Sequence, residues 1–200
     1  MNKNRRIAFL LAVLFCLSAV TFVAVAKYIK DVPFSGNVTF TANLAETFTL
    51  TESEAKRNTD GTYSLDTGTS KAENTYTLMP GVDVPKDPKI TIEGKTAVPA
   101  YLYVEVCSNL PTTVAYSMAE GWKALGIIGP KGGKVYVYGT VLDGTTPNLT
   151  IQILENDTLK VSQNLLRGTT ATMTFYGYMA QQVSAYANAT ETFTANFPNP

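Results

Sequence analysis

Residues 78–106 alternate apolar and polar side chains between strong turn signals, and this pattern constrains the fold more than any other part of the sequence. Pro80 and Gly81 indicate a turn, because proline presets φ at one corner and glycine tolerates a positive φ at the next. Pro85 and Pro88 exclude a central strand between them, because proline has no backbone N–H to donate.

Two half-buried strands are predicted on either side of a corner at residues 94–95. In residues 89–93 the isoleucines alternate with polar side chains, and residues 100–106 alternate in the same way. One face of the second strand carries Leu102, Val104 and Val106, and the other carries Tyr101, Tyr103 and Glu105. A strand, a corner and a strand of this kind form the central unit of an antiparallel sandwich.

Residues before this unit also favour strands. The threonine-rich residues 37–50 alternate apolar and β-branched polar side chains, which is typical of a strand with one solvated face. Residues 52–74 are polar, and Asp60-Gly61 within them indicates a hairpin turn. We therefore expect a polar surface insertion at 52–74.

Later segments continue the pattern. Residues 149–154 and 158–161 are predicted to form a hairpin, and residues 169–179 a long strand. Gly177 stands where the next apolar residue is due, which indicates a bulge or a close backbone approach. Asn188 and Glu191 resemble a capping box before a short C-terminal helix. The sequence predicts an all-β fold, an antiparallel, jelly-roll-like β-sandwich over residues 37–200.

Residues 1–26 have the layout of a secretory signal peptide. Lys3, Arg5 and Arg6 precede an apolar run, and Ala24 and Ala26 fit a cleavage site before Lys27. The run is also long enough for an uncleaved signal-anchor, which stays the alternative. Cleavage predicts a secreted protein that meets signal peptidase during export and has no membrane attachment afterwards.

Charge and cysteine content argue against nucleic-acid binding and against an internal disulfide. Without the three basic residues of the leader, 13 basic residues face 16 acidic ones, a net charge of −3 that does not favour nucleic acid. Cys107 is the single cysteine after residue 26, so an internal disulfide is excluded.

Nothing in the sequence predicts catalysis, a metal or a cofactor. The chain has no histidine, which removes the commonest general base and metal ligand, and leaves Cys107 without an imidazole partner. We expect solvated loop charges rather than calcium ligands at Glu52, Glu54, Asp60 and Asp66. Glu93 and Glu105 stand alone on their strands, so no closely spaced glycosidase pair is predicted. An aromatic sugar-binding face, with core packing as the alternative, would use Trp122, Tyr101, Tyr103, Tyr136 and Tyr138.

Short motifs along almost the whole chain resemble the TasA/camelysin-like family of bacterial secreted proteins with SipW-type signal peptides. They are residues 24–28 (AVAKY), the threonine-rich first strand, Pro80-Gly81, residues 86–88 (KDP), residues 98–101 (VPAY), residues 121–123 (GWK), residues 135–138 (VYVY) and residues 175–182. The resemblance implies a structural subunit of a biofilm matrix or surface fibre on the bacterial cell surface, which joins copies of itself, and other matrix proteins, by donating an N-terminal strand.

This role is assigned to an arm at residues 27–36, before the sandwich domain. Its assembly residues are Lys27, Tyr28, Ile29, Lys30, Asp31, Val32, Pro33 and Phe34. An unpaired sheet edge offers backbone donors and acceptors to such a strand. Two other classes stay open, namely a monomeric adhesin or carbohydrate-binding sandwich and a camelysin-like peptidase.

Overall fold

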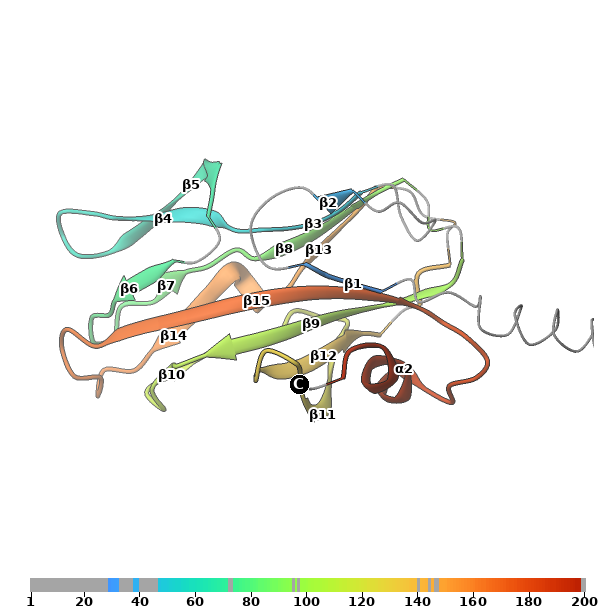
Figure 1. Ribbon diagram of the computed structural model, residues 1–200. Coiled ribbons are helices and arrows are strands. Elements are labelled where there is room, and N and C mark those ends of the chain that lie inside the picture. The colour runs from blue at the N-terminus through green and yellow to red at the C-terminus, as the bar shows by residue number, and fades with distance from the viewer. Residues whose placement is uncertain are drawn as a thin grey trace, which may run out of the picture.

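The computed structural model describes residues 29–32, 38–39, 47–71, 74–94, 96, 98–139, 141–143, 145 and 148–198 (Figure 1). Four antiparallel sheets make up most of this part of the chain. The largest has the strand order β1 (Ile29–Val32), β15 (Thr170–Gln181), β9 (Ala100–Ser108), β12 (Lys134–Tyr138) and β11 (Trp122–Ile128), with β6 (Thr75–Thr77) also on β15. The predicted antiparallel β-sandwich is confirmed.

Three smaller sheets complete the strands. The facing layer has the order β13 (Leu149–Gln152), β8 (Lys89–Glu93), β3 (Thr47–Thr51) and β2 (Val38–Thr39). A short sheet consists of β10 (Val114–Ala115), β14 (Thr158–Val161) and β7 (Val84–Pro85). A separate hairpin consists of β4 (Ser53–Arg57) and β5 (Tyr63–Ser70). In the part of the chain that the structure describes, the helical segments are the 3-10 turn η1 (Glu155–Asp157) and the helix α2 (Ala189–Asn196).

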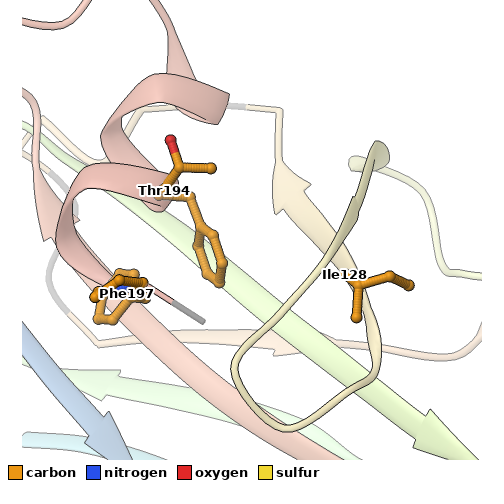
Figure 2. A pocket seen from close by; sticks show the side chains of 5 residues that line it. Ile128, Thr194 and Phe197 are labelled. Carbon is orange, nitrogen blue, oxygen red and sulfur yellow. The ribbon is translucent and has the colours of Figure 1, made fainter. Parts of the chain in front are cut away.

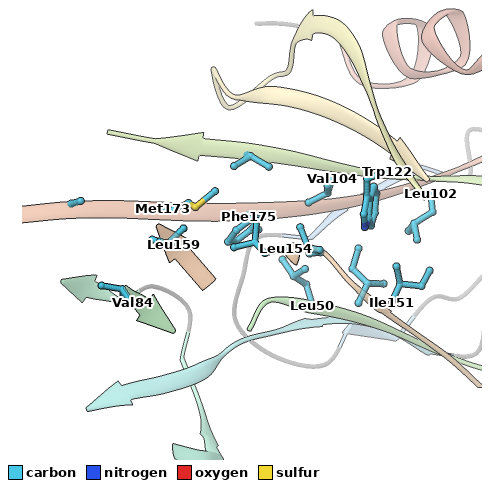
Figure 3. Close-up of a cluster of buried hydrophobic side chains, with 14 of the residues drawn as sticks. Leu50, Val84, Leu102, Val104, Trp122, Ile151, Leu154, Leu159, Met173 and Phe175 are labelled. Carbon is cyan, nitrogen blue, oxygen red and sulfur yellow. The ribbon is translucent and has the colours of Figure 1, made fainter. Parts of the chain in front are cut away.

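The main core lies between the two larger sheets (Figure 3). Ile90 and Ile92 of β8 are buried as the alternation predicts, and they belong to the same cluster as Leu102 and Val104 of β9. Strands β8 and β9 therefore lie in opposite layers of the sandwich, although they follow one another in the chain. Each such side chain contributes about 1.5–3 kcal/mol to folding when it is fully buried.

A second apolar cluster covers the opposite face of the largest sheet. Tyr103 of β9 and Tyr178 of β15 have no exposed surface there, and they pack against Phe193 and Phe197 from the α2 segment. The helix lies under this sheet in Figure 1. The predicted capping box is present, because the Asn188 side chain accepts a hydrogen bond from the backbone N–H of Glu191. Strand β9 is thus buried on both faces, not on one.

The predicted hairpin over residues 149–161 is wrong. Strand β13 pairs with β8, whereas β14 pairs with β7 and β10, so the two segments belong to different sheets. The turn residues between them, Asn156 and Asp157, both have positive φ, and η1 carries the chain from one sheet to the next. Asn156 and Asp157 do form a turn, but the pairing partners of β13 and β14 are distant in the sequence.

The polar insertion is an ordered hairpin. Strands β4 and β5 pair across the predicted Asp60-Gly61 turn, where Gly61 has a φ of 88°. The Asp60 carboxylate accepts hydrogen bonds from the backbone N–H and the hydroxyl of Thr62. The tip of this hairpin is exposed, but its base is not.

Gly177 marks a close approach rather than a bulge. The ladder between β15 and β9 runs through it without a shift in register. A Cβ built on Gly177 would lie 2.8 Å from the ring atom Cζ of Phe48, which belongs to the facing layer. The missing side chain therefore makes room for an aromatic ring in the core.

We expect Gly177→Ala to lower the free energy of unfolding by about 1–3 kcal/mol, because an added methyl group overpacks this contact. Urea denaturation measures the difference. Gly68→Ala is the matched control, since a Cβ there would meet Asp66 at an ordinary 3.4 Å on an exposed strand. Equal stability of the two variants would contradict the packing role of Gly177.

Candidate functional site

The predicted assembly arm is described in part. Residues 29–32 form β1 at the edge of the largest sheet, antiparallel to β15, with Ile29 opposite Ala180 and Val32 opposite Gly177. Outside the described residues lie Lys27, Tyr28, Pro33 and Phe34 of the arm, and Ala24 and Ala26 of the predicted cleavage site. Part of the arm is therefore a strand on its own domain.

The direction of the backbone groups of β15 follows from one hydrogen bond. The N–H of Asn109 donates to the carbonyl oxygen of Thr172 at 3.2 Å, on the edge of β15 that faces β9. Backbone groups of an antiparallel strand alternate between its two edges. Odd-numbered residues of β15 therefore direct their backbone groups toward β1, and Ile29 and Ala180 form a non-hydrogen-bonded pair, in which Cα atoms are closest.

A buried ion pair lies inside the sandwich, at the base of the β4–β5 hairpin. Lys86 Nζ is 2.7 Å from Oε1 and 2.8 Å from Oε2 of Glu52, and the two side chains are 0% and 1% exposed. The ammonium also lies 5.6 Å and 5.3 Å from the ring centroids of Tyr76 and Phe175. Burial of two charges is costly, so a pair in this position needs close geometry and further hydrogen bonds.

Asn74 and Tyr76 supply such bonds to the same carboxylate. Asn74 Nδ2 donates to Glu52 Oε1 at 2.6 Å and to the carbonyl oxygen of Ser53 at 2.9 Å. Asn74 Oδ1 accepts from the backbone N–H of Ala55 at 2.9 Å. The Tyr76 hydroxyl is 3.3 Å from Glu52 Oε1, and burial followed by the charge of Glu52 raises the pKa of Tyr76. One carboxylate oxygen thus contacts an amine, a carboxamide and a phenol.

A second carboxylate ties the hairpin to the segment after β7. Asp87 accepts hydrogen bonds from the backbone N–H of Ser53 at 2.8 Å and from its hydroxyl at 2.7 Å. Asp87 is 8% exposed and Ser53 is 5% exposed. Lys86 and Asp87, which carry part of the family resemblance, are therefore buried contacts of the hairpin base.

The prediction that Glu52 is a solvated loop charge is wrong. Glu52 directly follows β3, on the same side as the buried Phe48 and Leu50, so the alternation of the strand carries it into the core. The other predicted loop charges, Glu54, Asp60 and Asp66, are surface groups bonded to Lys71, Thr62 and Lys56 respectively. In the described part of the chain, no group of three or more acidic or cysteine side chains could hold a metal ion.

Glu105 is a buried carboxylate whose hydrogen-bond partners are backbone N–H groups and a tyrosine hydroxyl. Its Oε1 accepts from the backbone N–H groups of Lys131 at 2.9 Å and Gly133 at 2.7 Å, and its Oε2 accepts from the Tyr178 hydroxyl at 2.6 Å. A Cβ on Gly129 would collide with this carboxylate. Glu105 therefore fixes the loop between β11 and β12, and Glu93 lies exposed in the other layer.

Cys107 lies beside this carboxylate. Burial, followed by the negative charge of Glu105, raises the pKa of the Cys107 thiol to about 11. The thiolate is the nucleophilic form of cysteine, so the protonated thiol is unreactive at neutral pH.

The five aromatic candidates do not form one surface. Trp122 is 8% exposed in the main core, where its ring packs on Tyr138 at 5.4 Å and its Nε1 donates to the carbonyl oxygen of Gln152. Tyr136 also packs against the main core, whereas Tyr101 and Tyr103 belong to the cluster under α2. The sheet itself separates the two groups, which leaves no shared aromatic platform for a sugar.

A small hollow lies between the β11–β12 loop and α2 (Figure 2). Ile128, Thr194 and Phe197 line it with Phe193 and Pro198, and its volume is about 50 Å³. Small-molecule sites occupy roughly 300–1,000 Å³. This hollow is therefore too small to be a ligand pocket.

Among the described residues, no helix is long and apolar enough to cross a membrane. Two features of the described residues stand out, namely the edge of the largest sheet that holds β1 and the buried cluster around Glu52. Comparison of the chain with family models, with curated proteins and with solved structures found no match.

Proposed function

We propose that this chain is a secreted structural protein, a subunit of an extracellular matrix or surface fibre in which copies exchange their N-terminal strands. The observation that carries the proposal is the position of β1, which is an antiparallel edge strand on β15.

Exchange of the strand at this edge should change the free energy of the subunits only slightly. Strand β1 has four residues, and its backbone bonds to β15 are the same whether the strand comes from its own chain or from a second copy. Exchange of an identical element between copies is a low-cost route to assembly, and main-chain hydrogen bonds supply its affinity. A copy that donates its strand and accepts another at the same edge joins an open chain of subunits.

Deletion of residues 27–35 should leave a folded monomer that forms no fibres. Electron microscopy of the secreted protein at rising concentration measures assembly, and circular dichroism measures the fold. Fibres that form as well without the arm would overturn the proposal.

Exchange between copies has its own readout. Ile29→Cys and Ala180→Cys, each placed in a Cys107→Ala chain, introduce cysteines at a pair of opposed positions with closely spaced Cα atoms. When the two variants are mixed during assembly and oxidised, we expect a disulfide between different chains. A cross-link that forms only when both cysteines are on one chain would show that the arm stays on its own domain.

A further inference from the structure

The buried cluster at the base of the β4–β5 hairpin holds the groups needed to form a covalent bond between two side chains. We propose that Lys86 and Asn74 join spontaneously through an isopeptide bond, with Glu52 as the proton-transfer group. The cluster is separate from the β1 edge, so this inference does not depend on fibre assembly.

The nucleophile and the group that it attacks are both hydrogen-bonded to the same oxygen atom of Glu52. Lys86 Nζ and Asn74 Nδ2 lie 2.7 Å and 2.6 Å from Glu52 Oε1. Lys86, Asn74 and Glu52 are 0%, 3% and 1% exposed, so water is largely kept from all three. Fixed neighbours of this kind replace a bimolecular encounter by a small movement within the cluster.

The Lys86 amine lies in apolar surroundings. Lys86 Nζ lies near the faces of Tyr76 and Phe175, within the apolar core. An ammonium and a carboxylate lose hydration free energy when they are removed from water. Transfer of a proton from Lys86 to Glu52, which makes both groups neutral, therefore costs less here than at the surface. Lysine in an apolar site is an established form of activated nucleophile.

The carboxamide of Asn74 is held for attack at its carbon. Its Oδ1 accepts from the backbone N–H of Ala55 at 2.9 Å, and this oxygen becomes negative when the amine adds to Cγ. A fixed backbone donor at such an oxygen stabilises the tetrahedral intermediate. Its Nδ2, the leaving group, is already bonded to Glu52.

The atoms and charges of the step balance. Lys86 first gives one proton to Glu52, and the Nζ electron pair then forms the bond to Asn74 Cγ while the C=O electrons move to Oδ1. Glu52 gives its proton to Nδ2 and takes one from Nζ. The Cγ–Nδ2 bond breaks, its electron pair leaves with Nδ2 as ammonia, and the amide carbonyl forms again. The products are a secondary amide, ammonia and a neutral Glu52 carboxylic acid, with no oxidant or co-reactant.

The test is the mass of the purified secreted protein and of its tryptic peptides. We expect an intact mass that is lower than the sequence mass by one ammonia molecule. Trypsin does not cleave after a lysine whose Nζ is an amide, so residues 72–89 should appear as one peptide that lacks one ammonia. A free peptide of residues 72–86 with the full sequence mass would overturn the proposal.

Other sources of the same mass change are separable. A succinimide at Asn74 also releases ammonia, but it leaves Lys86 open to trypsin, and this outcome would overturn the proposal as well. Glu52→Gln should restore the full sequence mass although the amine and carboxamide remain. Lys71→Arg is the matched control, because Lys71 pairs with Glu54 on the outside of the same hairpin, and it should keep the loss of ammonia.

Discussion

Replacing Lys86 by methionine is expected to lower the free energy of unfolding by about 3–5 kcal/mol. Methionine fills the same space, but it leaves the Glu52 carboxylate inside the core without the ammonium that contacts both of its oxygens. Removal of one member of a buried pair has this cost because the remaining charge stays desolvated. Urea denaturation of the wild type and the variant measures the difference, to which loss of the proposed isopeptide bond adds where that bond has formed in the wild type.

Two further variants separate the buried charge from other effects. The double variant Glu52→Gln/Lys86→Met removes the carboxylate charge but keeps an oxygen for Asn74, so it should recover part of the loss. Neither variant can form the proposed isopeptide bond, and their difference therefore reports the unpaired charge alone. Lys160→Met is the surface control, since the Lys160–Asp83 pair is 66% and 43% exposed and should change stability by about 0–1 kcal/mol. A loss for Lys86→Met as small as this would contradict the role of the pair.

Replacing Phe193 by alanine is expected to lower the free energy of unfolding by about 3–5 kcal/mol. The Phe193 ring is 1% exposed and lies 5.0 Å from Tyr103 and 5.4 Å from Tyr178, measured between ring centroids. Its loss leaves a cavity between α2 and the outer face of the largest sheet. Urea denaturation measures this loss too.

Thr194→Ala is the matched control in the same helix. Thr194 is exposed, and its hydroxyl bonds only within the helix in the contacts described, so its replacement should change stability by about 0.5 kcal/mol or less. If Phe193→Ala costs no more than Thr194→Ala, the helix does not contribute to the stability of the sandwich.

Local patterns in the sequence were enough to predict the strands and several turns. The period-2 alternation of residues 89–93 and 100–106 places the same side chains in the core that the structure buries. Gly81, Asp60-Gly61 and the Asn188–Glu191 box also act through their immediate neighbours. These features depend on backbone preferences within a few residues, which a sequence contains in full.

The sequence does contain a signal for the buried cluster. Glu52 continues the inward positions of Phe48 and Leu50, and Lys86 has the same parity as Val84 and Ile90. Asn74 likewise precedes Tyr76 and Leu78 at inward positions, and all three polar residues are buried. The alternation therefore indicated their direction. Their charge and polarity nevertheless favour a surface position when the sequence is considered alone, because a single buried charge is costly until its partner is known.

Local sequence patterns are enough to place most strands, their alternating faces and the start of the helix. Long-range contacts assign the strands of residues 149–161 to two different sheets and place α2 over the outer face of β9. Folding also brings Asn74 and Lys86 to the same oxygen atom, Oε1 of Glu52. Alternation is a property of one strand and can be followed along the sequence. Strand pairing and burial depend on segments that are far apart in the chain, so they appear only in the folded protein.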